Sequence, residues 1–160
     1  MLKEGQKAPD FSLPDVDMRQ VKSADFRGEK NLVLFFYPRT GASSCSIVAI
    51  EFTEMIQEFQ AEKTAVIGIN MEDCGCHAAF RDRYDLAVGL LSDESGELCK
   101  AFGVWREATA GGERTNVLPC TFIIDREGVI RHVLHDVKPV GHAAQVLELI
   151  RSMDEPQEAA

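Results

Sequence analysis

The sequence contains two uninterrupted apolar runs, residues 31–37 and 64–70, and each is followed by a polar stretch and then a helical pattern. Runs of this length, apolar on both faces, are typical of central parallel strands. After the first run, apolar residues at 48, 49, 52, 55, 56 and 59 recur at the spacing of one helix face, which predicts a helix to about residue 62. The repeated strand, turn and helix restrict the chain to an α/β sheet with helices on its faces.

The remaining pattern predicts one domain over residues 1–153 and a loose tail over 154–160. We expect short edge strands within 5–21, a helix at 76–84, a strand at 86–91 and a helix at 95–102. A hairpin of strands 121–125 and 129–134 and a terminal helix at 142–153 complete the domain. The two apolar strands should be parallel neighbours, so the loops after them open at the same end of the sheet, where α/β sites form.

Cys45 stands at the start of the helix that follows the first apolar strand. Free N–H groups and the positive end of the helix dipole favour an anion at such a position. We therefore expect a lowered pKa for the Cys45 thiol and a reactive thiolate. The alternative interpretation is a small buried apolar residue, which is the usual role of a free cysteine.

The composition of the chain limits the kinds of binding partner and the cellular compartment that we expect. The net charge of −9 argues against nucleic acid or an anionic membrane as a partner, because both require a basic surface. The start of the sequence lacks the basic and apolar regions of a signal peptide, and no apolar run is long enough to cross a membrane, so we expect a cytoplasmic protein. Five cysteines in a reducing compartment favour catalytic or redox roles over a disulfide framework.

Several short motifs occur in a fixed order around Cys45. They are Ala8-Pro-Asp-Phe-Ser-Leu-Pro14, Phe26-Arg-Gly28, Phe36-Tyr-Pro38, Leu90-Leu-Ser-Asp93 and Thr121-Phe-Ile-Ile-Asp125. In this order they resemble the peroxiredoxins of the thioredoxin superfamily (AhpC/TSA-like), and within them the bacterioferritin-comigratory or PrxQ-type group. The resemblance implies a thioredoxin-like fold with a central mixed β-sheet flanked by helices.

The resemblance also implies a thiol-dependent peroxidase. Cys45 would reduce hydrogen peroxide or an organic hydroperoxide, become a sulfenic acid, form a disulfide with a second thiol, and be restored by a thioredoxin-like dithiol reductant. No metal or organic cofactor is needed, because sulfur carries the electrons. We expect a monomer or a weak homodimer.

The active-site motif of the family, Pro-x-x-x-Thr-x-x-Cys, is only partly present. Pro38 and Cys45 keep its spacing, but the Thr position is Ala42. Positions that carry Arg and Glu in the family are here Pro119 and Val48.

Neighbouring residues could replace the missing groups. Ser43 or Ser44 could supply the hydroxyl, although either fits an N-cap equally well. Arg39, in the turn itself, is the preferred source of positive charge, ahead of Arg106 and Arg114.

Pro119 suggests two alternative functions. Pro119-Cys-Thr-Phe122 is similar to the cis-proline segment of thioredoxin-like reductases, although a trans bond is the usual state of proline. One alternative is therefore a thiol–disulfide oxidoreductase that uses Cys45 with Cys74 and Cys76. The other is a redox-sensing or binding module that kept the fold and lost the chemistry.

The second thiol is expected in Cys74-Gly75-Cys76, because the positions at which the family carries it are Ile50 and Arg81. Gly75 permits a close, strained and easily reduced ring. Cys76 is preferred over Cys74 because a helix start should favour its thiolate. Cys120 ranks third and Cys99 is expected in the core. A zinc site with His77 is disfavoured because zinc sites use C-x2–4-C spacing.

Overall fold

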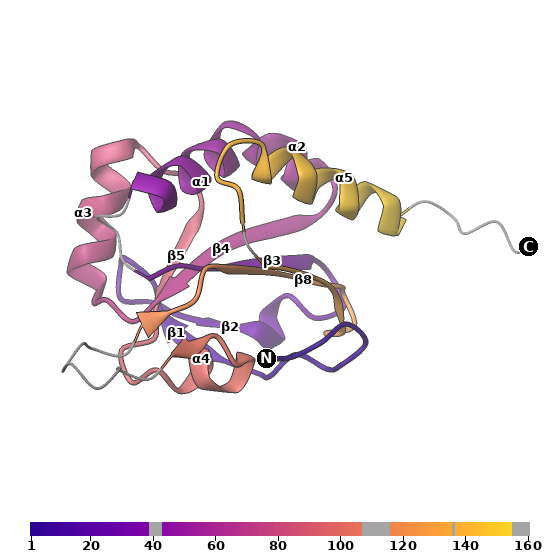
Figure 1. The fold of residues 1–160 in the computed structure, drawn as a ribbon, viewed down its shortest axis with the longest axis horizontal. Coiled ribbons are helices and arrows are strands. Elements are labelled where there is room, and N and C mark those ends of the chain that lie inside the picture. Colours follow the sequence, from indigo (N-terminus) through magenta and orange to yellow (C-terminus); the bar gives the residue numbers. More distant parts are fainter. Residues whose placement is uncertain (39–42, 107–115, 136, 155–160) are drawn as a thin grey trace, which may run out of the picture.

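A five-stranded sheet in the order β5-β4-β3-β8-β9 forms the centre of the molecule (Figure 1). The computed structural model describes residues 1–38, 43–106, 116–135 and 137–154. Strands β3 (Asn31–Phe36), β4 (Thr64–Asn70) and β5 (Gly89–Ser92) are parallel to one another. Strand β8 (Cys120–Ile124) pairs antiparallel with β3, and β9 (Ile130–Leu134) pairs antiparallel with β8. The mixed sheet, the parallel pairing of the two apolar runs and the late hairpin are therefore confirmed.

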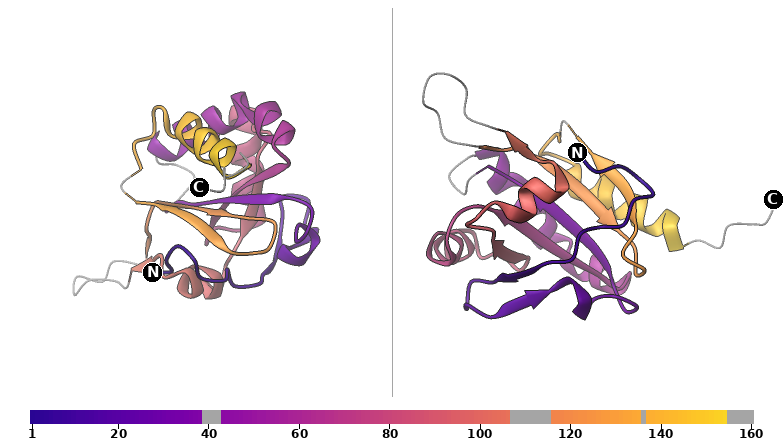
Figure 2. Two further views of the ribbon diagram at one scale, coloured as in Figure 1. Left: turned by 90° about the vertical axis from the view of Figure 1, so that its right-hand side faces the viewer. Right: turned by 90° about the horizontal axis from the view of Figure 1, so that it is seen from below.

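Three helices cover one face of the sheet, and a fourth stands at the end where β3 and β4 finish (Figures 1 and 2). The three are α1 (Ser43–Glu54), α2 (Ile56–Ala61) and α5 (His142–Asp154), and the fourth is α3 (Cys74–Tyr84). The predicted single helix to about residue 62 is interrupted at Met55. The Met55 N–H still donates to the Glu51 carbonyl at 3.2 Å, so the segment bends without losing its backbone bonding.

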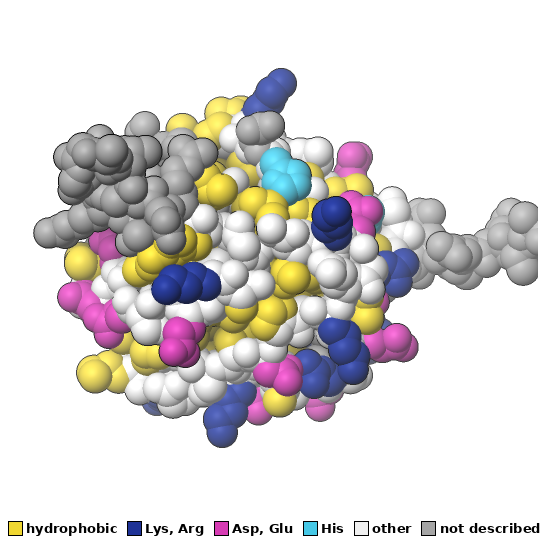
Figure 3. Space-filling model, turned by 60° about the horizontal axis from the view of Figure 1, so that its bottom comes forward, with side chains coloured by type: hydrophobic (Ala, Val, Ile, Leu, Met, Phe, Trp, Pro, Cys, Tyr) yellow, Lys and Arg dark blue, Asp and Glu magenta, His cyan; other side chains and the backbone are white. Residues whose placement is uncertain are grey.

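The opposite face is covered by α4 (Glu97–Phe102), the 3-10 turn η1 (Ser23–Asp25) and the N-terminal segment. The short strands expected in this segment are β1 (Ser12–Pro14) and β2 (Gln20–Lys22), which pair with each other and form a separate two-stranded sheet. Their turn is closed by the Asp15 carboxylate, which accepts the N–H groups of Asp17 and Arg19. Figure 3 shows acidic and basic side chains interspersed over this side of the molecule.

Two further boundaries differ from the prediction. Strand β5 begins at Gly89 instead of residue 86, because α3 ends at Tyr84, its C-cap Asp85 has a left-handed φ of 52°, and the chain must then cross to the sheet edge. Helix α4 begins at Glu97, after Gly96. The short pair β6 (Trp105–Arg106) and β7 (Asn116–Val117) was not predicted. None of the helices described is long and apolar enough to span a membrane.

Side chains of β3 alternate between two cores. Val33, Phe35 and Tyr37 lie in the core beneath α1 and α5, whereas Leu34 and Phe36 lie in the core that α4 covers. Strand β3 is buried on both faces, and β4 is buried at all but one residue, as the continuous apolar runs predict. This alternation determines which face of the sheet each side chain of β3 occupies, including those near Cys45.

Two histidines are buried inside these layers. His77 of α3 is 0 % exposed and His142, at the start of α5, is 2 % exposed. The Nε2 atom of His142 lies 2.8 Å from the Thr121 hydroxyl of β8. Burial lowers the pKa of each imidazole to about 4, because the charged form is poorly solvated there.

Acid should therefore destabilise the fold through these two histidines. An unfolded histidine has a pKa of about 6.5, so the unfolded chain binds more protons than the folded chain between about pH 6.5 and pH 4. The contribution is complete above that window and is lost as the pH falls through it, by about 3 kcal/mol for each histidine. Urea unfolding at pH 7.0 and pH 4.5 measures this loss.

His142→Gln keeps a donor toward Thr121 but cannot be protonated. We expect it to lower stability at pH 7 and to give a shallower loss of stability with acid than the wild type. His135→Gln, at an exposed position, is the matched control. Identical acid slopes for the two variants would contradict the assignment.

Candidate active site

Cys45 lies on the first turn of α1, directly beyond the carboxyl end of β3. Its side chain is 6 % exposed and belongs to the core cluster that includes Tyr37 and Val48. The prediction of one thiol at a helix start after a central strand is thus confirmed. A buried thiol at this position is accessible only through a pocket.

Such a pocket, of about 80 Å³, reaches Cys45 from the solvent. Its walls come from the end of β3, from α1, from the start of β8 and from the segment before α5, and most of them are apolar. The lining residues are Phe35, Phe36, Tyr37, Cys45, Val48, Pro119, Cys120, Thr121, Val137 and Pro139. The pocket therefore offers an apolar surface to the group that approaches the thiol.

The structure describes only some of the other residues that were predicted to form the site in this turn. Pro38 follows β3 and is half-buried, and Ser43 and Ser44 are the first two residues of α1. Arg39 lies outside the described residues, as does the Ala42 position. Pro119 is exposed, and no cis peptide bond occurs among the described residues, so the Leu118–Pro119 bond is trans.

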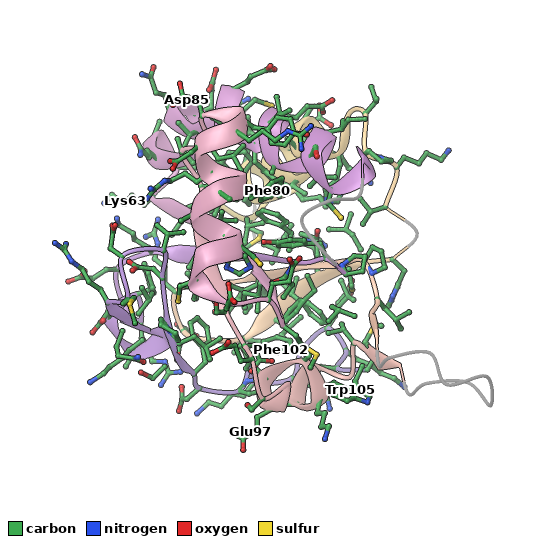
Figure 4. The ribbon with its side chains drawn as sticks, turned by 90° about the vertical axis from the view of Figure 1, so that its left-hand side faces the viewer. Lys63, Phe80, Asp85, Glu97, Phe102 and Trp105 are labelled. Carbon is green, nitrogen blue, oxygen red and sulfur yellow. The ribbon has the colours of Figure 1, made fainter. Side chains whose placement is uncertain are left out.

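Tyr37 is a residue of this site that the sequence reasoning missed. Its N–H donates to the Ile69 carbonyl at 3.2 Å, which extends the β3–β4 pairing by one residue. Its ring stacks on Phe35 at 5.7 Å and lies 6.1 Å from the Phe80 ring and 6.2 Å from that of His77. Figure 4 shows Phe80 on the core side of α3. Through these contacts the end of β3, the strand that precedes Cys45, packs against α3.

The hydroxyl of Tyr37 is buried, and it has no hydrogen-bond partner in the part of the chain that the structure describes. Burial raises the pKa of the Tyr37 hydroxyl well above its ordinary value, and the negative charges of Glu72 and of ionised Cys45 raise it further. The phenol is therefore neutral at physiological pH, and its hydroxyl can donate a hydrogen bond to an acceptor that comes within reach.

His77 is fully engaged in a buried network. Its Nε2 atom lies 2.5 Å from Asn70 Oδ1 and its Nδ1 atom 3.2 Å from the Ser92 hydroxyl. Because an amide oxygen can only accept, Nε2 carries the proton and Nδ1 accepts from Ser92. His77 is thus a neutral structural residue. No three His, Cys, Asp or Glu residues within the described ranges are grouped to hold a metal ion.

The Cys74-Gly-Cys76 pair forms the start of α3, beside the end of β4. The Asp73 carboxylate caps this helix by accepting the Cys76 N–H at 2.8 Å. Cys74 is half-buried and Cys76 is exposed. Positions two apart on a helix do not face each other, so a Cys74–Cys76 ring would require the first turn to unwind.

The expectation of a favoured thiolate at Cys76 was wrong. A hydrogen bond from the thiol to the Asp73 carboxylate raises the pKa of Cys76, and slight burial and the charge of Glu72 add to this effect. The capping carboxylate is thus the main cause of the raised pKa. The same contact, through the Cys76 backbone N–H first, lowers the pKa of Asp73.

Cys99 and Cys120 lie on the far side of the sheet from Cys45. Both belong to the core under α4, and the Cys120 thiol contacts the Met1 sulfur at 3.8 Å. Burial raises the pKa of Cys120 to about 12 and that of Cys99 higher still. Although Cys120 contributes to the pocket wall, its position on β8 directs its side chain to the same face as Phe36, with which it is paired.

Comparison with known proteins gives a consistent set of relatives. The model of the AhpC/TSA family matches residues 4–133. Peroxiredoxin Bcp of Escherichia coli strain K12 is 35 % identical over 151 residues, which cover 94 % of this chain and 96 % of that protein. Peroxiredoxin Bcp of Bacillus subtilis strain 168 is 32 % identical over 152 residues, with 94 % and 96 % covered.

Solved structures agree in fold. Peroxidoxin BcpB from Mycobacterium tuberculosis superposes with a TM-score of 0.88 at 27 % identity, over 96 % of this chain and 99 % of that one. A cysteine variant of PrxQ from Xylella fastidiosa gives 0.89 at 25 % identity, over 97 % and 99 %. The bacterioferritin comigratory protein of Xanthomonas campestris, described for its alkyl peroxide reduction activity, gives 0.83 at 24 % identity, over 89 % and 91 %.

The control of Cys76 by Asp73 can be tested with a minimal change. Asp73→Asn removes the negative charge but keeps a good N-cap side chain, so helix α3 should persist. We expect the pKa of Cys76 to fall and its alkylation at neutral pH to become faster. Glu94→Gln, an exposed neutralisation elsewhere, is the control. Alkylation rates of Cys76, followed by peptide mapping over a pH series, give the answer; an unchanged or raised midpoint in Asp73→Asn would contradict the assignment.

Proposed function

Because the chain belongs to the AhpC/TSA family and is a peroxiredoxin of the Bcp/PrxQ type, a thiol-dependent peroxidase of hydroperoxides, we propose that Cys45 is the thiol that attacks the peroxide. The observation that carries the proposal is the position of Cys45 at the start of α1, where it lines the 80 Å³ pocket. The helix start favours the thiolate there, and the pocket admits a small substrate.

The first step forms a sulfur–oxygen bond and breaks the peroxide oxygen–oxygen bond. The Cys45 thiolate attacks the terminal oxygen of the hydroperoxide, and the departing alkoxide takes a proton and leaves as an alcohol, or as water when the substrate is hydrogen peroxide. Sulfur is oxidised by two electrons to a sulfenic acid. No other redox group is required.

The second step needs a thiol that can reach Cys45, and the arrangement of the two cores narrows the choice. Cys99 and Cys120 face the other core. Cys74 and Cys76 stand at the start of α3, whose Phe80 packs in the same core as Cys45. We therefore assign the resolving role to Cys76, the exposed thiol, with Cys74 as the relay that could exchange with it. Its attack expels water and forms the disulfide.

Cys45 must leave its buried position before this disulfide can form, since its side chain is 6 % exposed whereas Cys76 lies on the outside of α3. Local unfolding of the first turn of α1 would release it. A thioredoxin-like dithiol in the cytoplasm would then reduce the disulfide. Because the pKa of Cys76 is raised, its thiol is mostly protonated and should react only slowly with peroxide itself.

The walls of the pocket favour a substrate with an apolar group. Aromatic, aliphatic and proline side chains line it, among them Phe35, Val48, Val137 and Pro139. Each methylene that moves from water into such a pocket contributes about 0.8 kcal/mol, which is about fourfold in kcat/KM. We therefore expect organic hydroperoxides to be preferred over hydrogen peroxide.

The alternative of a thiol–disulfide exchanger finds less support. Its main argument was a cis-proline at position 119, and the bond before Pro119 is trans. A redox-sensing or binding module without chemistry would require a family member that has lost its activity. The buried thiol, its pocket and the nearby exposed thiol favour the peroxidase.

Stopped-flow measurement of peroxide consumption tests the proposal. Wild-type protein should consume cumene hydroperoxide faster than hydrogen peroxide, and both far faster than free cysteine does. Cys45→Ser should lose both activities entirely, because Cys120, the other thiol that lines the pocket, has a pKa raised to about 12 by burial and stays protonated.

Cys99→Ala, in the opposite core, is the matched control and should keep the rate of the first turnover. Equal rates for wild type and Cys45→Ser would remove Cys45 from the reaction. A preference for hydrogen peroxide would contradict only the assignment of the apolar pocket.

A further inference from the structure

The Tyr37 hydroxyl is a buried donor with no described partner, in a site where the other buried polar groups are occupied. His77 is held between Asn70 and Ser92, and the Thr121 hydroxyl is engaged with His142. The Tyr37 side chain is 3 % exposed, so water does not satisfy its hydroxyl. A buried unpaired donor is costly, and a phenylalanine would avoid this cost.

The ring of Tyr37 is held firmly in place. It stacks on Phe35 and lies over Gly68 of β4. A Cβ at position 68 would stand 2.5 Å from Phe35 Cζ and 3.0 Å from Tyr37 Cε1, so only glycine lets the two rings lie across the strand. Phe80 and His77 close the other side. The hydroxyl therefore has little freedom to turn elsewhere.

Cys45 lies within electrostatic range of this hydroxyl, since the charge of the thiolate acts on it together with that of Glu72. Both residues also belong to one core cluster and line the same pocket. A thiolate accepts hydrogen bonds well, whereas a protonated thiol is a weak acceptor. Ionisation of Cys45 thus creates the acceptor that the phenol lacks.

We propose that the Tyr37 hydroxyl donates a hydrogen bond to the ionised sulfur of Cys45 and is a further catalytic residue of this enzyme. It supplies a polar contact at a site where the Thr and Arg positions of the family motif are Ala42 and Pro119. The proposal rests on the assignment of Cys45 as the reacting thiol. Hydrogen bonding to the charged form stabilises that form, so the contact favours the thiolate.

The other groups around the thiol make this donor more important. Glu72, after β4, acts electrostatically on the Tyr37 hydroxyl, and its Oε1 atom accepts a hydrogen bond from the Asn70 amide at 2.9 Å. His77 from α3 and His142 from α5 are neutral above about pH 4. Tyr37 itself stays protonated. The helix start and the phenol are thus two groups that favour a thiolate.

The alkylation rate of Cys45 by iodoacetamide over pH 5–10 tests the proposal. A Cys74→Ser, Cys76→Ser background removes the two accessible thiols, and the raised pKa values of Cys99 and Cys120 keep their thiols protonated and slow to react. In this background, Tyr37→Phe should raise the midpoint of the profile by about one pH unit and slow alkylation at pH 6 about tenfold. Tyr84→Phe, at the only other tyrosine of the chain, is the matched control and should leave the profile unchanged.

A second measurement separates this role from a structural one. Because Tyr37→Phe removes an unpaired buried hydroxyl, its thermal midpoint should be no lower than that of the wild type. A profile of Tyr37→Phe that superposes on the wild type, or an equal shift in Tyr84→Phe, would overturn the proposal. If the wild type consumed peroxide no faster than Cys45→Ser, the proposed peroxidase function would fail, and that result is independent of the alkylation profile.

Discussion

The site depends above all on the alternation of side chains along β3. This strand lies in the middle of the sheet, between β4 and β8, and both of its faces are buried. Phe35 and Tyr37 point to the core beneath α1, and Phe36 points to the core beneath α4. A slip of one residue in register would exchange these faces and would move Tyr37 away from the thiol. The positions of the site residues therefore depend on the register in which β3 pairs with its neighbours.

The same alternation divides the five cysteines into two groups. Cys45 belongs to the core under α1, and Cys74 and Cys76 begin the helix that packs against that core. Cys99 and Cys120 belong to the other core, where burial keeps their thiols protonated. A disulfide across the sheet would require a central strand to leave its place. The thiols at the start of α3 avoid that cost, which is why we propose them as the partners of Cys45.

The apolar runs made most of the fold predictable from the sequence. Residues 31–37 and 64–70 are apolar at nearly every position, and they became the parallel pair at the centre of the sheet. The first segment was less predictable, because β1 and β2 are short strands that pair with each other through a turn set by Asp15. Their position depends on tertiary contacts and not on a periodic pattern.

The site was predictable to the extent that it depends on chain order. Cys45 follows from the sequence of strand, turn and helix. Tyr37 does not, because its significance lies in a hydroxyl that lacks a partner, and pairing is visible only in three dimensions. The pKa of Cys76 was misjudged for a similar reason. The sequence shows the helix start, but the bond from the thiol to the Asp73 carboxylate depends on the geometry of the cap.

The most direct test of this account is to identify which cysteine pairs with Cys45. Reduced protein would be treated with one equivalent of hydroperoxide, alkylated, digested without reduction and mapped by mass spectrometry. The account predicts a linkage of Cys45 to Cys76 or Cys74, with Cys99 and Cys120 recovered as free thiols. A linkage of Cys45 to Cys120, or a stable sulfenic acid on Cys45 with every other thiol free, would contradict it.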